Sequence, residues 1–249
     1  TKFALEKIPT IGRPSVKVIQ LIEEGIKGII SPGIIFDELG FRYIGPITEG
    51  HNIKLLVNTL ENVKKLPGPK LLHVITKKGK GYEPAEKNPT LFHGIGKFDK
   101  KTGAIIKDGS AQVYSSVFSE ELVRLATSND KITAIVAAMI EGTNLSNFRD
   151  KFPERFFDVG IAEEHAVTFA SGLAASGLRP VVAVYSTFMQ RAVDQIIHDT
   201  AISNLPVVFA MDRAGLVGED GPTHHGVFDI AFMKMVPNMT VMAPSCGEE

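Results

Sequence analysis

RFFDVGIAEEHAVTFASGLAASG, from Arg155 to Gly177, starts as a short apolar run and continues as a stretch of small residues. Its first part predicts a buried strand over 156–161, and the rest predicts a helix packed closely on a sheet. Glu163 and Glu164 stand between the two, at the carboxyl end of the strand, where open α/β sheets bind ligands. A helix dipole alone also favours acids in a first turn. The stretch therefore predicts an α/β sheet and makes Glu163 a candidate site residue, with an ordinary first-turn acid as the alternative.

The same alternation of apolar strands and helical segments extends in both directions. Toward the amino terminus, the pattern predicts a helix over 16–30, a strand over 41–46, a helix over 53–66 and a strand from residue 71. A helix over 116–127 and strands over 132–138, 180–185, 206–212 and 239–243 complete the second half. We expect an α/β fold with parallel, doubly wound sheets. The charged text KFDKKTGAIIKDGSAQVYS predicts a linker over 99–115, between domains over 1–98 and 116–249.

Composition excludes several classes of protein. A formal net charge of -1 and a pI near 6.6 give the chain no overall attraction to nucleic acid or to an anionic membrane. The single cysteine, Cys246, has no partner for an internal disulfide, which fits a reducing cytoplasm. No apolar run is long enough to span a bilayer. The sequence also lacks a phosphate-binding loop, a dinucleotide fingerprint and a protein-only metal motif, so we expect no metal ligand within it.

Four motifs occur in a fixed order along the chain. KKGKGYEPAEKNP starts at Lys77 and is followed by FHG at Phe92, YSTFMQRAVDQ starts at Tyr185, and DRAGLVGEDGPTHHG starts at Asp212. With the DVGIAEEHAV stretch, they resemble the 1-deoxy-D-xylulose-5-phosphate synthase family, thiamine-diphosphate enzymes of the transketolase superfamily. The resemblance runs from about residue 15 to residue 249. Several motifs in one register are far more specific than any one alone.

The resemblance implies a thiamine diphosphate site with Mg²⁺, whose metal ligands in the family lie outside the region matched here. Glu163 matches the carboxylate that exchanges a proton with the aminopyrimidine ring, and Glu164 stands where the family usually has glutamine. Phe188 matches the aromatic residue that stacks on that ring. Tyr82, Met139 and Ile161 match further cofactor contacts, although without the resemblance the apolar Met139 and Ile161 would be read as core residues.

The resemblance also implies a site for two small substrates, pyruvate and D-glyceraldehyde 3-phosphate. His93 matches a catalytic histidine on the pyruvate side, and His224 matches a catalytic residue on the aldehyde side. His51 matches a substrate-contacting histidine, although Glu49 replaces the usual aspartate beside it. The aldehyde phosphate is assigned to arginines and their neighbours, because a guanidinium binds phosphate with paired donors. With His224, these residues are Tyr185, Arg191, Arg213 and Asp220.

The family resemblance predicts a transferase that condenses pyruvate with the aldehyde, releases carbon dioxide and forms 1-deoxy-D-xylulose 5-phosphate. This is the entry step to isoprenoid biosynthesis without mevalonate, and it also feeds thiamine and pyridoxal biosynthesis. A homodimer in a bacterial cytoplasm, rather than in a plastid stroma, is the expected setting. The alternatives are a transketolase, a 2-oxoacid dehydrogenase subunit, and a non-catalytic dimerisation or regulatory module of the same fold. Because the chain does not begin with Met and covers less than half of a typical member, we expect it to be a fragment. We expect the fragment to be inactive, because the family's ligands for the Mg²⁺ diphosphate lie outside the region matched here.

Overall fold

A computed structural model describes residues 33–106 and 113–249, which divide between two compact units, Thr1–Asp108 and Gly109–Glu249. The division falls inside the segment 99–115 that the sequence marks as a linker. The domain bounds expected above stay a prediction, and the helix expected over 16–30 lies outside the described residues. In the described ranges, no helix combines the length and the apolar character needed to cross a lipid bilayer.

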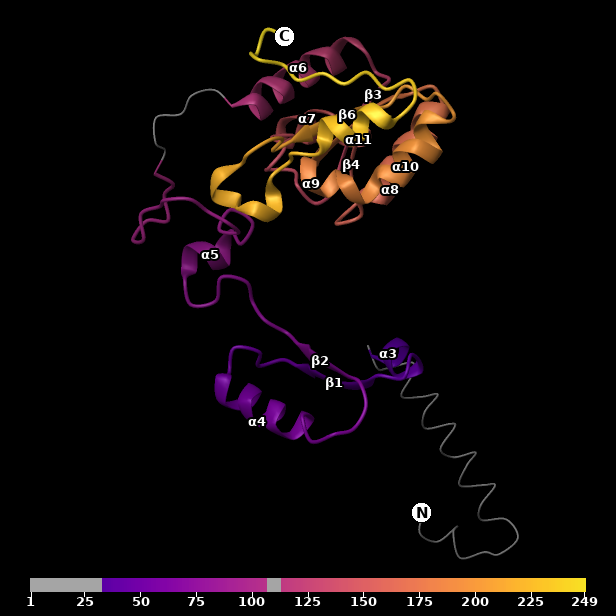
Figure 1. Cartoon of the computed structure of the whole chain (residues 1–249). Coiled ribbons are helices and arrows are strands. Elements are labelled where there is room, and N and C mark those ends of the chain that lie inside the picture. Colours follow the sequence, from indigo (N-terminus) through magenta and orange to yellow (C-terminus); the bar gives the residue numbers. More distant parts are fainter. Residues whose placement is uncertain (1–32, 107–112) are drawn as a thin grey trace, which may run out of the picture. The chain divides into compact units, whose positions relative to one another are not determined.

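The first unit contains a parallel strand–helix–strand motif. Strand β1 (Arg42–Ile47) pairs in parallel with β2 (Lys70–Val74), and α4 (Ile53–Val63) connects them, while α3 (Ile34–Glu38) precedes β1 (Figure 1). Asn52 starts α4 because its side-chain oxygen accepts a hydrogen bond from the Leu55 amide at 3.1 Å. The strand, crossover helix and strand expected from the sequence are confirmed.

The segment that follows β2 is held together by aromatic rings. Helix α5 (Glu83–Lys87) begins directly after Tyr82, whose ring centroid lies 5.5 Å from that of Phe92 and 6.0 Å from that of Phe98. Phe98 pairs with Ile105 in an antiparallel bridge, and the Asp99 carboxylate closes the intervening turn. The segment from residue 97 to residue 106 is therefore an ordered turn, although its charged composition favours a linker.

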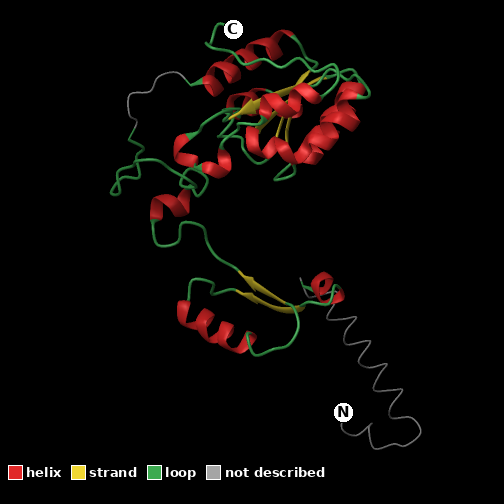
Figure 2. Cartoon of the chain, viewed as in Figure 1, coloured by secondary structure: helices red, strands yellow, loops and turns green. Residues whose placement is uncertain are grey.

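The second unit is a four-stranded parallel sheet covered on both faces. Its strands are β3 (Ile132–Val136), β4 (Phe156–Asp158), β5 (Arg179–Tyr185) and β6 (Val208–Asp212), in the order β4-β3-β5-β6. Successive strand residues alternate between two buried clusters. One cluster packs Ile135, Val182 and Val184 on α8 (Glu163–Ala175), and the other packs Ala134, Val136 and Ala183 on α6 (Tyr114–Ser128) and α7 (Ser146–Lys151). Figure 2 shows the strands between these helices, so the expected doubly wound α/β fold is confirmed.

Two segments of this unit depart from regular structure. The chain after β5 is a broken helix: α9 (Ser186–Met189), a 3₁₀ turn over Gln190–Ala192, α10 (Val193–Gln195) and a π-helical turn over Ile196–Ala201. The strand expected over 239–243 is wrong. Asn238 has a φ of 60° and the Met239 amide bonds back to the Val236 carbonyl at the end of α11 (Asp229–Met235). The chain therefore turns back along that helix instead of extending the sheet.

Candidate functional site

Glu163 is the first residue of α8 and is buried. The chain reaches it through Gly160, whose φ of +72° turns the backbone at the end of β4. Only 2% of Glu163 is exposed, and its Oε1 lies 3.8 Å from Nη1 of the half-exposed Arg191. Glu164, the next residue, is exposed. Burial therefore distinguishes the two acids and selects Glu163, because removing a carboxylate from water costs free energy and is unusual for an ordinary first-turn acid.

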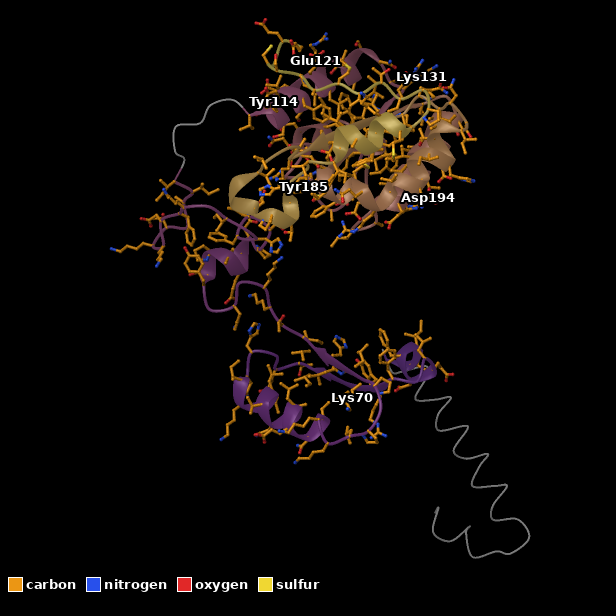
Figure 3. The ribbon with its side chains drawn as sticks, viewed as in Figure 1. Lys70, Tyr114, Glu121, Lys131, Tyr185 and Asp194 are labelled. Carbon is orange, nitrogen blue, oxygen red and sulfur yellow. The ribbon has the colours of Figure 1, made fainter. Side chains whose placement is uncertain are left out.

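Phe188 lies in the broken helix after β5 and links Arg191 to two other rings. The Arg191 guanidinium carbon lies 5.2 Å from the Phe188 ring centroid. The Phe188 ring also stacks against Tyr185, with ring centroids 5.6 Å apart. It packs against the His224 ring in an edge-to-face arrangement, with ring centroids 5.5 Å apart. Figure 3 labels Tyr185 beside the gold ribbon of the loop that follows β6. Two segments far apart in the sequence, residues 185–191 and the loop that carries His224, therefore meet in one cluster.

Arg213 is fixed in place by four different contacts. It follows β6 with a φ of 55°, a conformation that side chains with a Cβ rarely adopt. Its Nη1 donates to the Gly142 carbonyl and to Asp212 Oδ2, both at 3.1 Å, and its Nε lies 3.6 Å from Asp220 Oδ2. The guanidinium carbon lies 3.9 Å from the Tyr185 ring centroid. The charge of Arg213 is thus paired, and a phosphate group would compete with Asp220 for it.

Tyr185 ends β5 with its hydroxyl against Gly142. A Cβ at Gly142 would stand 1.8 Å from the tyrosine oxygen, so only glycine leaves room for this ring. Burial raises the pKa of Tyr185 above its usual value of 10, and the nearby Arg213 opposes this only in part. The hydroxyl therefore stays a neutral hydrogen-bond donor at physiological pH.

The loop carrying Asp220 and His224 is closed at its base by a two-way backbone bridge. The Gly215 amide donates to the Gly226 carbonyl at 3.1 Å, and the Gly226 amide donates to the Gly215 carbonyl at 2.8 Å. A Cβ at Gly226 would stand 1.9 Å from Ser186 Oγ and 2.9 Å from Asp229 Oδ2. Close packing at this point therefore sets where the loop starts and ends.

Asp229 and Ser186 are buried beneath that bridge. Within the described part of the chain, neither the serine oxygen nor the two carboxylate oxygens complete a hydrogen bond. Burial raises the pKa of Asp229 above its usual 3.8, and the nearby Ser186 hydroxyl lowers it by less, although the two side chains do not meet the geometry of a hydrogen bond. The sequence did not single out Asp229 or Gly142, since neither belongs to the residues that the family resemblance marks.

The structure joins seven of the predicted residues through consecutive contacts. They are Glu163, Arg191, Phe188, Tyr185, His224, Arg213 and Asp220. Met139 lies outside this series, partly buried against the core that α8 covers, and Ile161 is 85% exposed. Exposure of this size contradicts the alternative of a core role for Ile161.

The three remaining candidates lie in the first unit. Tyr82 donates its hydroxyl proton to the Lys100 carbonyl at 3.1 Å, and His51 accepts a hydrogen bond from the Lys77 amide at its Nε2. Lys77 also forms an ion pair with Glu86, and the Gly81 amide donates a hydrogen bond to the same carboxylate. Together these two contacts lower the pKa of Glu86 to about 2. His93 is exposed in a turn. Each of these residues is placed by contacts within its own unit.

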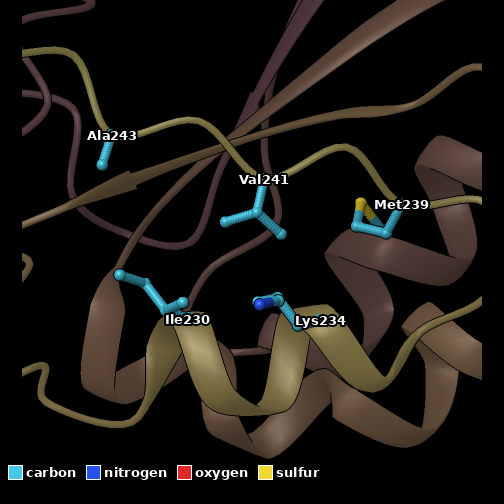
Figure 4. A pocket seen from close by; sticks show the side chains of 5 residues that line it. All are labelled: Ile230, Lys234, Met239, Val241 and Ala243. Atoms are coloured by element: carbon cyan, nitrogen blue, oxygen red, sulfur yellow. The ribbon is translucent and has the colours of Figure 1, made fainter.

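One pocket of the second unit lies apart from these residues. It has a volume of about 380 Å³ and is lined by four apolar residues and Lys234, between α11 and the segment over 239–243 (Figure 4). It offers one cation and no carboxylate, so it does not suit proton transfer. Within residues 33–106 and 113–249, no three His, Cys, Asp or Glu side chains gather as metal ligands would.

Two family models match the chain. The model for "Transketolase, pyrimidine binding domain" matches residues 110–249, and the model for "1-deoxy-D-xylulose-5-phosphate synthase" matches residues 1–76. Among individual proteins, the 1-deoxy-D-xylulose-5-phosphate synthase of Aquifex aeolicus is 60% identical over 238 residues, and that of Syntrophotalea carbinolica is 56% identical over 241. Each match covers 96% of this chain but 38% of the relative, so the chain spans about two fifths of their length. A solved split-gene transketolase, an inactive β4 tetramer, is 32% identical with a TM-score of 0.46 over 52% of this chain and 42% of its own.

Proposed function

The chain belongs to the transketolase pyrimidine-binding family, within the branch of the 1-deoxy-D-xylulose-5-phosphate synthases, and we propose that it forms the pyrimidine-side part of such an enzyme. The proposed reaction condenses pyruvate with D-glyceraldehyde 3-phosphate, releases carbon dioxide and forms 1-deoxy-D-xylulose 5-phosphate. The observation that carries this proposal is the series of contacts from the buried Glu163 through Arg191 and Phe188 to Arg213.

The residues present fit the aminopyrimidine end of thiamine diphosphate. A ring nitrogen needs a carboxylate that is shielded from water, and Glu163 is 2% exposed. A flat ring needs an aromatic or apolar surface, which Phe188 provides, and the exposed Ile161 leaves an apolar side chain free for a ligand. When bound, thiamine diphosphate supplies an electron sink for the loss of carbon dioxide. Glu163 would hold a proton on its carboxylate and exchange it with the aminopyrimidine ring nitrogen.

The cluster at the ends of β5 and β6 suits the phosphorylated aldehyde. Arg213 and Arg191 carry the positive charge, and the neutral Tyr185 hydroxyl and the His224 ring offer hydrogen-bonding groups. Asp220 would leave Arg213 when the phosphate arrives, because its side chain is about half exposed at 3.6 Å and gains little from that ion pair. Met139 is assigned to the cofactor side, next to the core that α8 covers.

Residues of the first unit complete the proposal. Tyr82 is assigned to the cofactor, His93 to the pyruvate side and His51 to a substrate contact, all on the family motifs around them. We also propose that the ligands of the Mg²⁺ ion belong to parts of a full-length relative that this chain does not match. A homodimer in the bacterial cytoplasm is the proposed setting.

Reconstitution tests this function. A full-length synthase carrying this sequence should release carbon dioxide from pyruvate and form 1-deoxy-D-xylulose 5-phosphate only when thiamine diphosphate and Mg²⁺ are supplied. The isolated 249-residue chain should show no turnover, because the metal that anchors the diphosphate would lack its ligands. Turnover by the chain alone would contradict this division, and a full-length protein without thiamine-dependent turnover would contradict the function itself.

A further inference from the structure

One carboxylate oxygen joins two loops at the carboxyl end of the sheet. Asp158 is the last residue of β4, and its Oδ1 accepts hydrogen bonds from the Ala138 amide at 2.8 Å and from the Gly160 amide at 3.0 Å. Ala138 belongs to the loop after β3, and Gly160 belongs to the loop between β4 and α8. Hydrogen bonds to an ionised acceptor are stronger than those between neutral groups. Asp158 therefore connects two loops that leave the sheet from neighbouring strands.

Both donors have a positive φ, but only Ala138 is strained by it, because glycine adopts this conformation readily. Ala138 has a φ of 60°, which is unfavourable for a residue with a Cβ, and Gly160 has a φ of +72°. The ladder between β3 and β4 pairs Val136 with Asp158, and the Val159 amide still donates to the Val136 carbonyl at 3.0 Å. The ladder ends there, and the segments after β3 and β4 continue as separate loops. The Asp158 carboxylate therefore joins these two segments where the backbone hydrogen bonds stop. Strained backbone persists only where its surroundings hold it in place.

The two loops carry residues proposed to contact the cofactor. Met139 directly follows Ala138, and Ile161 directly follows Gly160, two residues before Glu163. We propose that Asp158 is a positioning residue that sets the distance between these loops and so the alignment of Met139, Ile161 and Glu163. The cofactor part of this inference rests on the proposed function, whereas the joining of the loops does not. Asp158 acts through the backbone and need not touch substrate or cofactor.

Two conservative substitutions separate geometry from charge. Asp158→Asn keeps an acceptor oxygen at the same distance from the backbone, and Asp158→Glu keeps the charge but moves it one methylene further out. In the 249-residue chain, Asp158→Glu should accelerate amide hydrogen exchange at Ala138 and Gly160, measured by NMR, by about 10- to 100-fold. The displaced carboxylate no longer accepts from these amides, and the lost protection is that of a charge-assisted hydrogen bond. Asp158→Asn should change these rates only a few fold.

Asp99 supplies a matched control. Its Oδ1 also accepts from two backbone amides, those of Lys101 and Thr102, both at 2.8 Å, but within the first unit. Asp99→Glu should accelerate exchange at those two amides and leave Ala138 and Gly160 unchanged. Unchanged exchange at Ala138 and Gly160 in Asp158→Glu would overturn the joining of the loops.

The dissociation constant of thiamine diphosphate, measured by calorimetry with Mg²⁺ in a full-length synthase carrying this sequence, tests the positioning role. Asp158→Glu should raise it about 10-fold, with Asp158→Asn and Asp99→Glu close to the parent and all melting temperatures similar. Faster amide exchange with unchanged cofactor affinity would make Asp158 structural only and overturn the proposal. A parent that binds no thiamine diphosphate would contradict the proposed function and the positioning role together, while the exchange data would still decide whether the two loops are joined.

Discussion

The start of α8 and the ends of β5 and β6 are joined by one series of contacts but are built differently. At α8, Glu163 is buried and lies 3.8 Å from an arginine that is itself half exposed. At β5 and β6, Arg213 is held by a carbonyl, two carboxylates and the face of Tyr185. The first region leaves a single carboxylate lightly held, and the second fixes several polar groups against one another.

This difference indicates a division of labour. A group that exchanges a proton gains from having few competing partners, because each strong hydrogen bond would favour one protonation state. A group that recognises a substrate gains from being fixed before the substrate arrives, because binding then costs less ordering. We therefore assign proton transfer to the start of α8 and recognition to the ends of β5 and β6.

The largest effect should come from Glu163. In a full-length synthase carrying this sequence, Glu163→Ala should lower kcat by about 10²- to 10⁴-fold, the usual contribution of a positioned acid or base. The melting temperature should change little, since the carboxylate makes few contacts. Steady-state kinetics and thermal unfolding measure the two effects. The exposed Glu164 supplies the matched control, and Glu164→Gln should have a mild effect by comparison. A Glu164→Gln variant as impaired as Glu163→Ala would show that proton transfer does not belong to Glu163 alone.

Arg213→Ala should affect one substrate more than the other. Loss of a charge-assisted contact is worth about 1.5–3 kcal/mol, so the KM for D-glyceraldehyde 3-phosphate should rise about 10- to 100-fold. The KM for pyruvate should stay near that of the parent. Equal losses for both substrates would mean that Arg213 mainly supports the fold, through its bonds to Gly142 and Asp212.

Gly142→Ala tests the tight packing beneath that cluster. A Cβ 1.8 Å from the Tyr185 hydroxyl oxygen must displace the ring or the loop, so the free energy of unfolding should fall by about 1–3 kcal/mol. Urea unfolding of the 249-residue chain measures this. Gly172→Ala in α8 is the matched control, because no atom outside the adjoining part of its own helix lies within 4 Å of its added Cβ and alanine favours a helix. If the two variants were equally stable, the contact between Tyr185 and Gly142 would be wrong.

Asp229 should give the smallest effect and a pH dependence of known sign. Burial raises the pKa of Asp229, so the folded chain holds this proton more tightly than the unfolded chain does. The contribution of Asp229 to the free energy of unfolding is therefore fully present when the pH lies below its usual pKa of 3.8. It is lost as the pH rises through the higher pKa that Asp229 has in the folded chain. Asp229→Asn should remove that loss and raise the free energy of unfolding at pH 7 by about 1 kcal/mol. A series of urea unfolding curves between pH 4 and pH 8 measures it.

The exposed Asp150 provides the comparison for that series. Asp150→Asn removes a carboxylate whose side chain is 67% exposed, and it should leave the pH dependence as in the parent. If Asp229→Asn lost stability at every pH, the Asp229 carboxylate would have a hydrogen-bonding role that its buried surroundings do not indicate.

Much of the fold followed from periodicity. The strands β3, β5 and β6 are short apolar runs between helical segments, and such runs indicate strands whatever their partners are. The segment over 239–243 has the same apolar character but is not a strand, because the left-handed Asn238 directs it along α11. Local composition could not indicate that turn.

The site was less accessible to sequence reasoning than the fold. Family motifs marked Glu163, Phe188 and Arg213, but not which of the two adjacent acids is buried. The requirement for glycine at position 142 depends on Tyr185, which is far away in the sequence and close only because β3 and β5 are neighbours. The same holds for the joining of Ala138 and Gly160 by Asp158. Contacts of this kind arise from strand order, which no single motif contains.

The division of labour between the two regions is tested most directly at the thiazolium carbon of the bound cofactor. The rate of hydrogen exchange at this carbon can be followed by quenched-flow NMR in a full-length synthase carrying Glu163→Ala or Arg213→Ala. We predict that exchange slows by about 10²-fold or more in Glu163→Ala and keeps the parental rate in Arg213→Ala. Parental exchange in Glu163→Ala, or equal slowing in both variants, would contradict the assignment of proton transfer to the start of α8.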